Sequence, residues 1–353
     1  MGKRPDVPTA GTAISAIALL GLAEQLANSL ARVPFREPWK GPSSVPHNLG
    51  QAVTRQVLRS FMGYSSSLPI EEFRSIEVVL DDLARVALPP VIRRMGVVAA
   101  DGEVGGVPGR WYRGRGRAAL GTIAYFHGGG YVGTSPAMYG AFLAAMARDT
   151  SCDIFAADYR LAPEFPFPAD LEDAVAVTEG LLADGVGPAR LFLGGDSGGG
   201  GLVHSLLFDE RSRHLPRPAG VLLISPEVDL RLDEPSVTEN ASKDILPWNI
   251  PTAAYLHGIE PDDPRVSVLD DADLVGHPPT FVAFGDDEMF RDSIRRFVDD
   301  LRQGGVDTVV VEEPGEFHVF PFLMPWAEAS HRVYQAMGAF VAQRLATPDE
   351  AIG

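Results

Sequence analysis

The chain has 353 residues, of which 45% are hydrophobic and 22% charged, an ordinary globular composition with enough apolar residues for a sizeable core. Its net charge of −17 argues against nucleic acid as a partner, because phosphates demand basic patches, whereas small neutral substrates remain natural. The single cysteine, Cys152, excludes an intramolecular disulfide framework and a cysteine-based zinc cluster, and it fits a reducing cytosol.

The first predicted element is an N-terminal helix that ends near Leu30. Two basic residues precede an apolar stretch, residues 13–23, as in the first parts of a signal peptide. The stretch is too short to span a bilayer, no clear cleavage site follows, and Leu22, Leu26 and Leu30 continue one helical face. We therefore expect a structural helix and a cytoplasmic protein without stable membrane insertion. A removed signal and a helix resting on a membrane are the alternatives.

The chain divides into two regions. Residues 1–95 predict helices and loops, with a proline-rich link and a helix near residues 71–86. Residues 96–353 form the second region, where short apolar runs alternate with helical patterns from Gly106 onward. This alternation predicts an α/β domain with a mostly parallel sheet flanked by helices, interrupted by an insertion at residues 232–262. The expected strands are residues 121–126, 153–157, 190–193, 220–224, 280–284 and 307–311, and the expected helices include residues 137–148, 171–182, 292–303 and 326–345.

A sharp turn around Ser197 follows the strand at residues 190–193. Gly195 and Gly199 flank the serine in a Gly-x-Ser-x-Gly pattern, which leaves a strained serine hydroxyl exposed between a strand and a helix. The same letters surround the nucleophile of trypsin-like proteases. Those chains place His and Asp before Ser, and their secreted members carry disulfides, so the order of motifs in this chain argues against a protease.

Consecutive glycines directly follow the strand at residues 121–126, in His127-Gly-Gly-Gly-Tyr131. Backbone N–H groups of such a turn can point into a site where an acyl intermediate carries its negative charge. We predict an oxyanion hole made by the N–H groups of Gly128, Gly129 and Gly198.

A serine nucleophile needs a histidine base and a carboxylate that orients it. His318 lies just past the last predicted strand, where a loop returns over the carboxyl edge of the sheet, and is the expected base. His127 belongs to the glycine turn and His204 to a helix face turned away from Ser197. The other histidines lie in proline-rich or charged surroundings, which predict a solvated surface position. They are His47, His214, His257, His277 and His331.

Acidic side chains cluster after the strand at residues 280–284. Local chemistry does not choose among Asp286, Asp287, Glu288 and Asp292, and the last of these has the character of a helix N-terminal residue. Asp229, which follows the preceding strand, is a fifth candidate for the triad acid.

Taken in order, these motifs resemble the hormone-sensitive-lipase-like group of α/β-hydrolases, the bacterial family IV esterases. The resemblance runs from about residue 100 to the C-terminus and is carried by residues 127–131, Tyr-Arg-Leu-Ala-Pro-Glu at 159–164, residues 195–199, Ser-Pro-x-x-Asp-Leu at 225–230, and the Glu288 and His318 loops. It implies an α/β-hydrolase fold whose N-terminal region and insertion form a helical cap.

The resemblance also implies roles for single residues. Glu288 takes the acid position of an acid-x-Leu-x-Asp pattern, where the family usually has Asp, and Asp287 and Asp229 remain alternatives. Asp196 is expected to give structural support, and Arg160 and Glu164 to brace the loop behind the site. Two departures from the family are Gly198, where alanine is usual, and Glu227, where an aromatic residue is frequent.

The expected function is that of a serine carboxylesterase. A triad of Ser197, His318 and Glu288 would hydrolyse short- to medium-chain acyl esters through an acyl-enzyme, without metal or cofactor. The expected partner is a small-molecule ester, and a homodimer is left open. The alternatives are an amidase or deacetylase with the same triad, and a non-catalytic binder, against which the retention of Ser197 and His318 argues.

Overall fold

The computed structural model describes residues 12–31, 33, 44–208, 214–247, 252–267, 274 and 276–346. The two basic residues near the N-terminus and most of the predicted proline-rich link lie outside the described residues, as do residues 248–251 of the predicted insertion.

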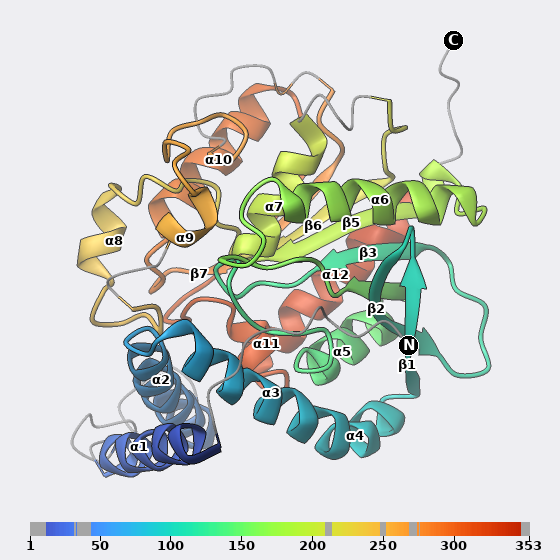
Figure 1. Ribbon diagram of the computed structural model, residues 1–353. Coiled ribbons are helices and arrows are strands. Elements are labelled where there is room, and N and C mark those ends of the chain that lie inside the picture. The colour runs from blue at the N-terminus through green and yellow to red at the C-terminus, as the bar shows by residue number, and fades with distance from the viewer. Residues whose placement is uncertain are drawn as a thin grey trace.

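An eight-stranded sheet runs through the centre of the molecule (Figure 1). Its strand order is β1-β2-β4-β3-β5-β6-β7-β8, and all neighbours from β4 to β8 pair in parallel. The strands are β1 Val97–Val104, β2 Val107–Gly114, β3 Thr122–Phe126, β4 Asp153–Ala157, β5 Leu191–Asp196, β6 Gly220–Ile224, β7 Thr280–Gly285 and β8 Thr308–Glu313. The six predicted strands are confirmed within three residues at their ends.

Two strands were not predicted. β1 and β2 form an antiparallel pair, and β2 joins the sheet antiparallel to β4. They lie at the edge of the sheet, so many of their side chains are exposed and polar, and the continuous apolar run that marks a buried strand is missing.

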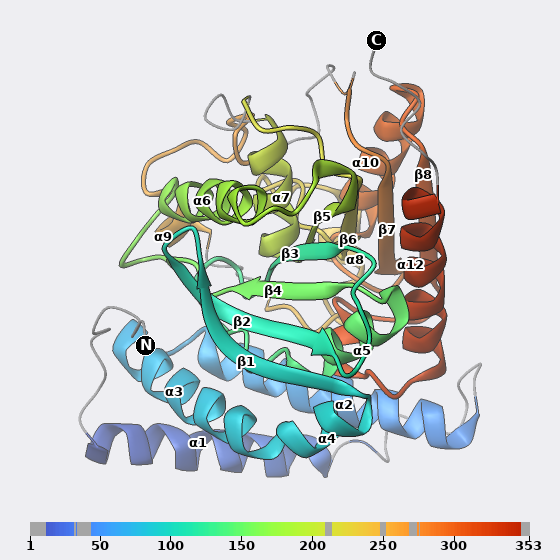
Figure 2. The ribbon, with the colours of Figure 1, turned by 90° about the vertical axis from the view of Figure 1, so that its right-hand side faces the viewer.

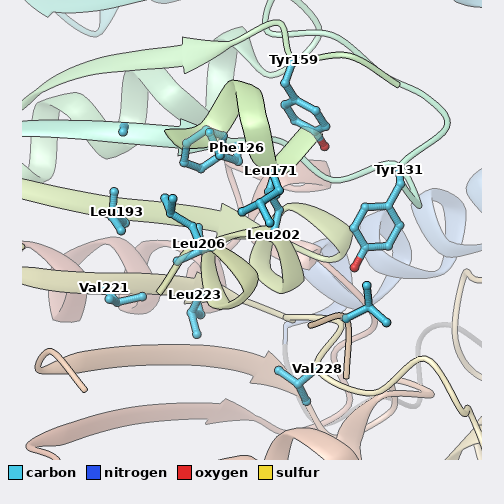
Figure 3. Packing of buried hydrophobic residues seen from close by; sticks show 14 of the residues in the cluster. Phe126, Tyr131, Tyr159, Leu171, Leu193, Leu202, Leu206, Val221, Leu223 and Val228 are labelled. Carbon is cyan, nitrogen blue, oxygen red and sulfur yellow. The ribbon is translucent and has the colours of Figure 1, made fainter. Parts of the chain in front are cut away.

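Helices cover both faces of the sheet (Figure 2). Apolar side chains of α5 Gly140–Thr150 and α12 Glu328–Ala346 pack against one face. The other face carries α6 Ala169–Ala183, α7 Gly198–Phe208 and α10 Arg291–Gln303. In Figure 3, Leu171 of α6 and Leu202 and Leu206 of α7 lie over strand residues such as Leu193 and Leu223. Burial of this apolar surface holds the strand ends in place.

In the described part of the chain, four helices precede the sheet and lie together along one side of it (Figures 1 and 2). They are α1 Thr12–Leu30, α2 Val45–Ser65, α3 Ile70–Ala87 and α4 Pro89–Arg94. Within the described part of the chain, no helix combines the length and the apolarity that crossing a membrane requires.

Among its described residues, the segment between β6 and β7 contains two short helices, α8 Pro235–Glu239 and α9 Ala253–Leu256. It interrupts the alternation of strands and helices, and the insertion predicted at residues 232–262 falls within it. A further short helix, α11 Phe320–Leu323, follows the loop that carries His318.

Candidate active site

Ser197 lies at the turn between β5 and α7, with a positive φ of 51°. A left-handed backbone at a residue other than glycine costs on the order of 1–3 kcal/mol and persists only where the surroundings fix it. The surroundings of Ser197 leave no room for side chains at the two flanking glycines. A Cβ at Gly195 would lie 2.3 Å from the Gly199 carbonyl oxygen, and a Cβ at Gly199 would lie 2.1 Å from the Phe126 carbonyl oxygen. The two glycines are therefore needed for close backbone approach, as the sequence predicts.

Asp196 ties this turn to the glycine loop after β3. Its buried carboxylate accepts hydrogen bonds from the hydroxyls of Tyr125, at 2.7 Å, and Tyr139, at 2.8 Å, and from the Gly128 N–H, at 3.0 Å. Burial raises the pKa of Asp196 to about 6, and these donors oppose the rise. The contacts give Asp196 the supporting position that the family resemblance implies.

The prediction for Gly128 needs correction. Its N–H donates to Asp196 and to the Tyr139 hydroxyl, at 3.1 Å, so this donor is directed into the protein. Among the described residues, the N–H groups of Gly129, Gly130 and Gly198 meet no acceptor. Gly128 instead allows close approach, since a Cβ there would lie 2.9 Å from the Ser197 Cβ. Gly130 was not among the predicted donors, although it belongs to the same glycine run.

His318 stands between Ser197 and Glu288. Its Nε2 lies 2.9 Å from the Ser197 Oγ, and its Nδ1 lies 3.1 Å from the Glu288 Oε2. The imidazole is buried, and the ring of Phe290 meets it edge-on with centroids 5.0 Å apart. Burial lowers the pKa of His318, while the charges of Asp244 and Asp196 raise it.

Glu288 is completely buried at the end of β7. Its Oε1 accepts the Gly285 N–H at 2.6 Å and the Ser225 hydroxyl at 3.0 Å, which leaves Oε2 directed at His318. The Ser225 Oγ also accepts the Val319 N–H at 3.0 Å and so connects the acid with the histidine loop. Burial raises the pKa of Glu288, whereas the Gly285 N–H and the Ser225 hydroxyl favour the ionised carboxylate and lower it.

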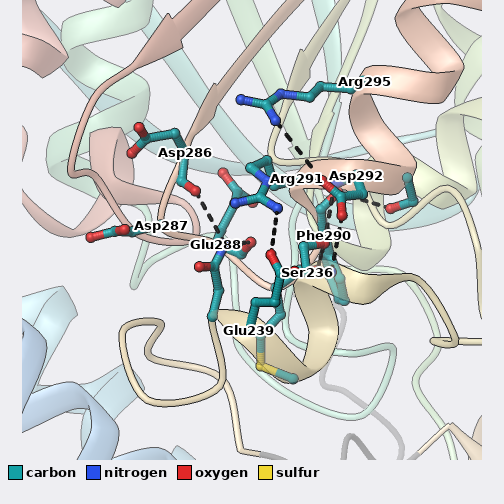
Figure 4. Close-up of polar contacts among 12 residues, drawn as sticks. Ser236, Glu239, Asp286, Asp287, Glu288, Phe290, Arg291, Asp292 and Arg295 are labelled. Atoms are coloured by element: carbon teal, nitrogen blue, oxygen red, sulfur yellow. Dashed lines mark hydrogen bonds and ion pairs between the residues drawn. The ribbon is translucent and has the colours of Figure 1, made fainter.

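The other acids have different partners. Asp287 pairs with Arg55 at 3.2 Å and with Lys243 at 3.1 Å, and Asp229 accepts three bonds from Arg231. In Figure 4 the carboxylate of Asp292 lies among Ser236, Arg291 and Arg295. Asp286 accepts the Gly315 N–H. Of the five candidates, only Glu288 contacts His318.

Within the described residues, His318 is the histidine that contacts the Ser197 hydroxyl, and the others have different surroundings. His127 is buried and stacks on Tyr159 with centroids 4.6 Å apart, and His204 is buried on α7 beside Phe208. The predicted surface position of two others is wrong. His277 is buried next to His204, and the buried His47 lies 3.4 Å from Glu316.

The two residues expected to brace the loop, Arg160 and Glu164, pair with other side chains. Arg160 binds Asp173 and Glu172, and Glu164 binds Arg74 of α3. In the described part of the chain, no group of three or more His, Cys, Asp and Glu side chains is arranged to hold a metal ion.

Comparisons with known proteins agree with this geometry. A family model described as alpha/beta hydrolase fold matches residues 123–322, more than half of the chain. The chain is 34% identical over 227 residues to an acetyl-hydrolase of Streptomyces hygroscopicus, covering 62% of this chain and 75% of that protein. It is 31% identical over 215 residues to the carboxylesterase NlhH of Mycobacterium tuberculosis, covering 57% of this chain and 67% of the relative.

A solved structure described as an esterase from the bacterial hormone-sensitive lipase family superposes with a TM-score of 0.68 and 29% identity, over 91% of this chain and 98% of that one. The chain therefore belongs to the alpha/beta hydrolase fold family, within its hormone-sensitive-lipase-like group of esterases, and is a carboxylic ester hydrolase.

Proposed function

We propose that the protein is a serine carboxylesterase in which Ser197, His318 and Glu288 form the catalytic triad. The observation that carries the proposal is the continuous chain of contacts from the Ser197 Oγ through both ring nitrogens of His318 to the Glu288 Oε2, at 2.9 and 3.1 Å. Hydroxyl, base and orienting acid within hydrogen-bond reach are the arrangement that activates a serine.

In the proposed reaction, His318 takes the hydroxyl proton while the Ser197 Oγ attacks the ester carbonyl. The resulting imidazolium then gives this proton to the leaving alcohol, and an acyl-enzyme remains. A water molecule, deprotonated by His318, attacks the acyl-enzyme, and the acid product leaves. Ionised Glu288 holds the proton of His318 on Nδ1, which keeps Nε2 free for the serine.

The oxyanion is assigned to the N–H groups of Gly129, Gly130 and Gly198. The support is that Gly198 directly follows Ser197, that Gly129 and Gly130 follow Gly128, where an added Cβ would lie 2.9 Å from the Ser197 Cβ, and that all three N–H groups lack an acceptor within the described residues. Donors held ready for a developing charge each contribute on the order of 10²–10³ in rate. Asp196 aids them indirectly, because it holds Gly128 and with it the start of the loop.

The cap is proposed to consist of the N-terminal helices and the segment at residues 232–262. Both reach the catalytic loops: Arg55 of α2 binds Asp287 and the Gly315 carbonyl, and Asn240 donates to the Glu288 carbonyl. The proposed substrates are short- to medium-chain acyl esters. The family resemblance and the similarity to an acetyl-hydrolase support this range.

Hydrolysis of p-nitrophenyl esters tests the proposal. Acetate and butyrate esters should react faster than palmitate esters in the wild type. Ser197→Ala should lower kcat/KM by about 10³-fold or more, and Glu288→Gln by about 10²–10⁴-fold, because the amide cannot fix the correct tautomer. Asp287→Asn is the matched control, since Asp287 adjoins Glu288 but binds Arg55 and Lys243. Its kcat/KM should stay within about threefold.

Two outcomes would reject the assignment. A Ser197→Ala protein with undiminished activity would exclude the nucleophile. Equal losses in Asp287→Asn and Glu288→Gln would remove the reason for choosing Glu288 as the acid.

A further inference from the structure

Asp244 is a completely buried carboxylate in the segment between β6 and β7, outside the proposed triad. Its Oδ2 accepts the Met289 N–H at 2.7 Å. Its Oδ1 accepts the His318 N–H at 3.0 Å and the Ile245 N–H at 2.7 Å. Three backbone donors to one carboxylate favour its ionised form. Burial raises the pKa of Asp244, and the neighbouring imidazole opposes that rise.

Two of the three N–H groups that donate to Asp244 lie on the loops that carry the proposed acid and base. Met289 directly follows Glu288, and the second bond is made by His318 itself. One side chain of the segment between β6 and β7, called the cap segment below, thus fixes the spacing between the backbones of the proposed acid and base. These two loops come from different strands, β7 and β8, and the Glu288 contact with His318 depends on how they lie relative to each other.

Other buried side chains of the same segment lack this double contact. Ser236 donates to the Met289 carbonyl at 2.7 Å and accepts the Asp292 N–H at 3.1 Å. Asn240 donates to the carbonyls of Asp286 and Glu288. Both residues hold the acid loop only, and neither carries a charge.

The charge of Asp244 acts on the same imidazole. The ionisable groups that act on His318 are Glu288 from the β7 loop, Asp196 from the nucleophile turn and Asp244 from the cap segment. Negative charges beside a buried imidazole favour its protonated form, which is the form created when the serine loses its proton.

We propose that Asp244 is a positioning residue of the esterase site, whose carboxylate aligns the Glu288 and His318 loops and stabilises the imidazolium formed during acyl transfer. The inference rests on the proposed function, because it assigns Asp244 a role through the proposed acid and base. It gives the cap segment a role in catalysis, in addition to any role of that segment in binding substrate.

The test compares the pH profiles of kcat/KM for p-nitrophenyl acetate in the wild type, Asp244→Asn and Ser236→Ala. The acid limb reports loss of a proton from the Glu288 and His318 pair in the free enzyme. Removal of the Asp244 charge should move this limb to lower pH by about half a unit or more. The kcat should fall by about tenfold or more with KM changed less than about threefold, because Asp244 acts on the reacting groups.

Ser236→Ala is the control for damage to the same loop. It removes two buried hydrogen bonds but no charge, so the acid limb should stay within about 0.2 units of the wild type. A purely structural role for Asp244 predicts the opposite direction. Loosening would admit water to the imidazole, relieve the burial that lowers its pKa, and move the limb to higher pH.

Asp244→Ser is the second variant, because serine has no side-chain N–H group. The amide of Asp244→Asn, in contrast, places an N–H group against the Met289 N–H. Thermal melts establish which variants are folded. An acid limb that stays in place or moves to higher pH in a folded variant would overturn the inference, as would failure of both variants to fold. An inactive wild type or a fully active Ser197→Ala protein would reject the proposed function itself. Either outcome is distinguishable from failure of the inference about Asp244.

Discussion

At the scale of single residues, the proposed triad acid is a glutamate, in a place where the family resemblance leads us to expect aspartate. The longer side chain reaches His318 because its other oxygen is held back by the Gly285 N–H and the Ser225 hydroxyl. Ser225 also accepts the Val319 N–H, so one hydroxyl sets both the carboxylate and the loop of its partner. The extra methylene of Glu288 is thus fixed by hydrogen bonds to the strand ends.

Glu227 is a second unusual acid, one residue after Pro226 on the β6 loop. It is 1% exposed, its Oε1 has no hydrogen-bond partner among the described residues, and its own N–H donates to the Ser197 carbonyl at 2.9 Å. Burial raises the pKa of Glu227 to about 8 from an ordinary value of 4.5. At neutral pH the side chain is therefore a protonated carboxylic acid close to the nucleophile turn.

This burial makes stability depend on pH. Between pH 4.5 and 8 the unfolded chain releases the Glu227 proton and the folded protein keeps it, so this residue destabilises the fold as pH rises. Glu227→Gln removes the titration. Its free energy of unfolding should exceed that of the wild type by a margin that grows from pH 5 to pH 8, up to an upper bound on the order of 5 kcal/mol, and its melting temperature should rise accordingly.

Thermal melts at several pH values check this expectation, with Glu103→Gln on the exposed side of β1 as the control. The control should follow the wild type at every pH. A Glu227→Gln protein whose margin stays constant or shrinks with pH would show that Glu227 is ionised in the folded protein.

At the scale of elements, the parallel strands bring distant motifs to one edge of the sheet. His127 follows β3, Ser197 follows β5, Glu288 follows β7 and His318 follows β8, and the carboxyl ends of parallel strands meet on the same side. Helix α3 then fixes the glycine loop from outside the sheet.

Arg74 of α3 is the residue that makes this connection. The buried guanidinium binds Glu164 at 2.7 Å, Glu77 at 2.6 Å and the carbonyl of Ala162, and it also donates to the Val132 carbonyl. Glu77 in turn accepts the Thr134 N–H, so both ends of the ion pair hold the loop that follows the glycines.

Arg74→Met should destabilise the protein by about 3–5 kcal/mol, because it leaves two carboxylates without their cation. It should also lower kcat/KM, since the oxyanion donors lie on the loop that Arg74 holds. Arg85→Met is the matched control on the same helix. Arg85 pairs with Asp81 and the exposed Asp101, and its loss should cost less than about 1 kcal/mol.

Urea unfolding and kinetics with p-nitrophenyl acetate measure both effects. Equal stability changes in the two variants would contradict the bracing role. So would a destabilised Arg74→Met protein that keeps full kcat/KM at a temperature where it is folded.

The strands that carry the site were predictable because each is a continuous apolar run buried on both faces. β1 and β2 were not, since edge strands mix exposed and buried side chains and lack such a run. The direction of single N–H groups was also beyond the sequence. Gly128 and Gly129 are identical in type, and only the folded structure shows that the Gly128 N–H is directed inward, to the Asp196 carboxylate on the neighbouring strand β5 and to the Tyr139 hydroxyl.

At the scale of the whole molecule, three separate parts of the chain meet at one site. The sheet provides Ser197, Glu288 and His318, the segment between β6 and β7 provides Asp244, and α2 and α3 hold the surrounding loops. The order of motifs along the chain pointed to the proposed triad. Asp244 has no neighbouring motif, so only the folded structure relates it to His318.

The most direct measurement of the central claim is the reaction of the protein with a p-nitrophenyl alkylphosphonate, which traps an activated serine. We expect release of about one equivalent of p-nitrophenolate per chain, with a mass adduct on the peptide that contains Ser197 and none in Ser197→Ala or His318→Ala. An adduct on another residue, or continued ester hydrolysis by a protein whose Ser197 is fully modified, would contradict the proposed triad.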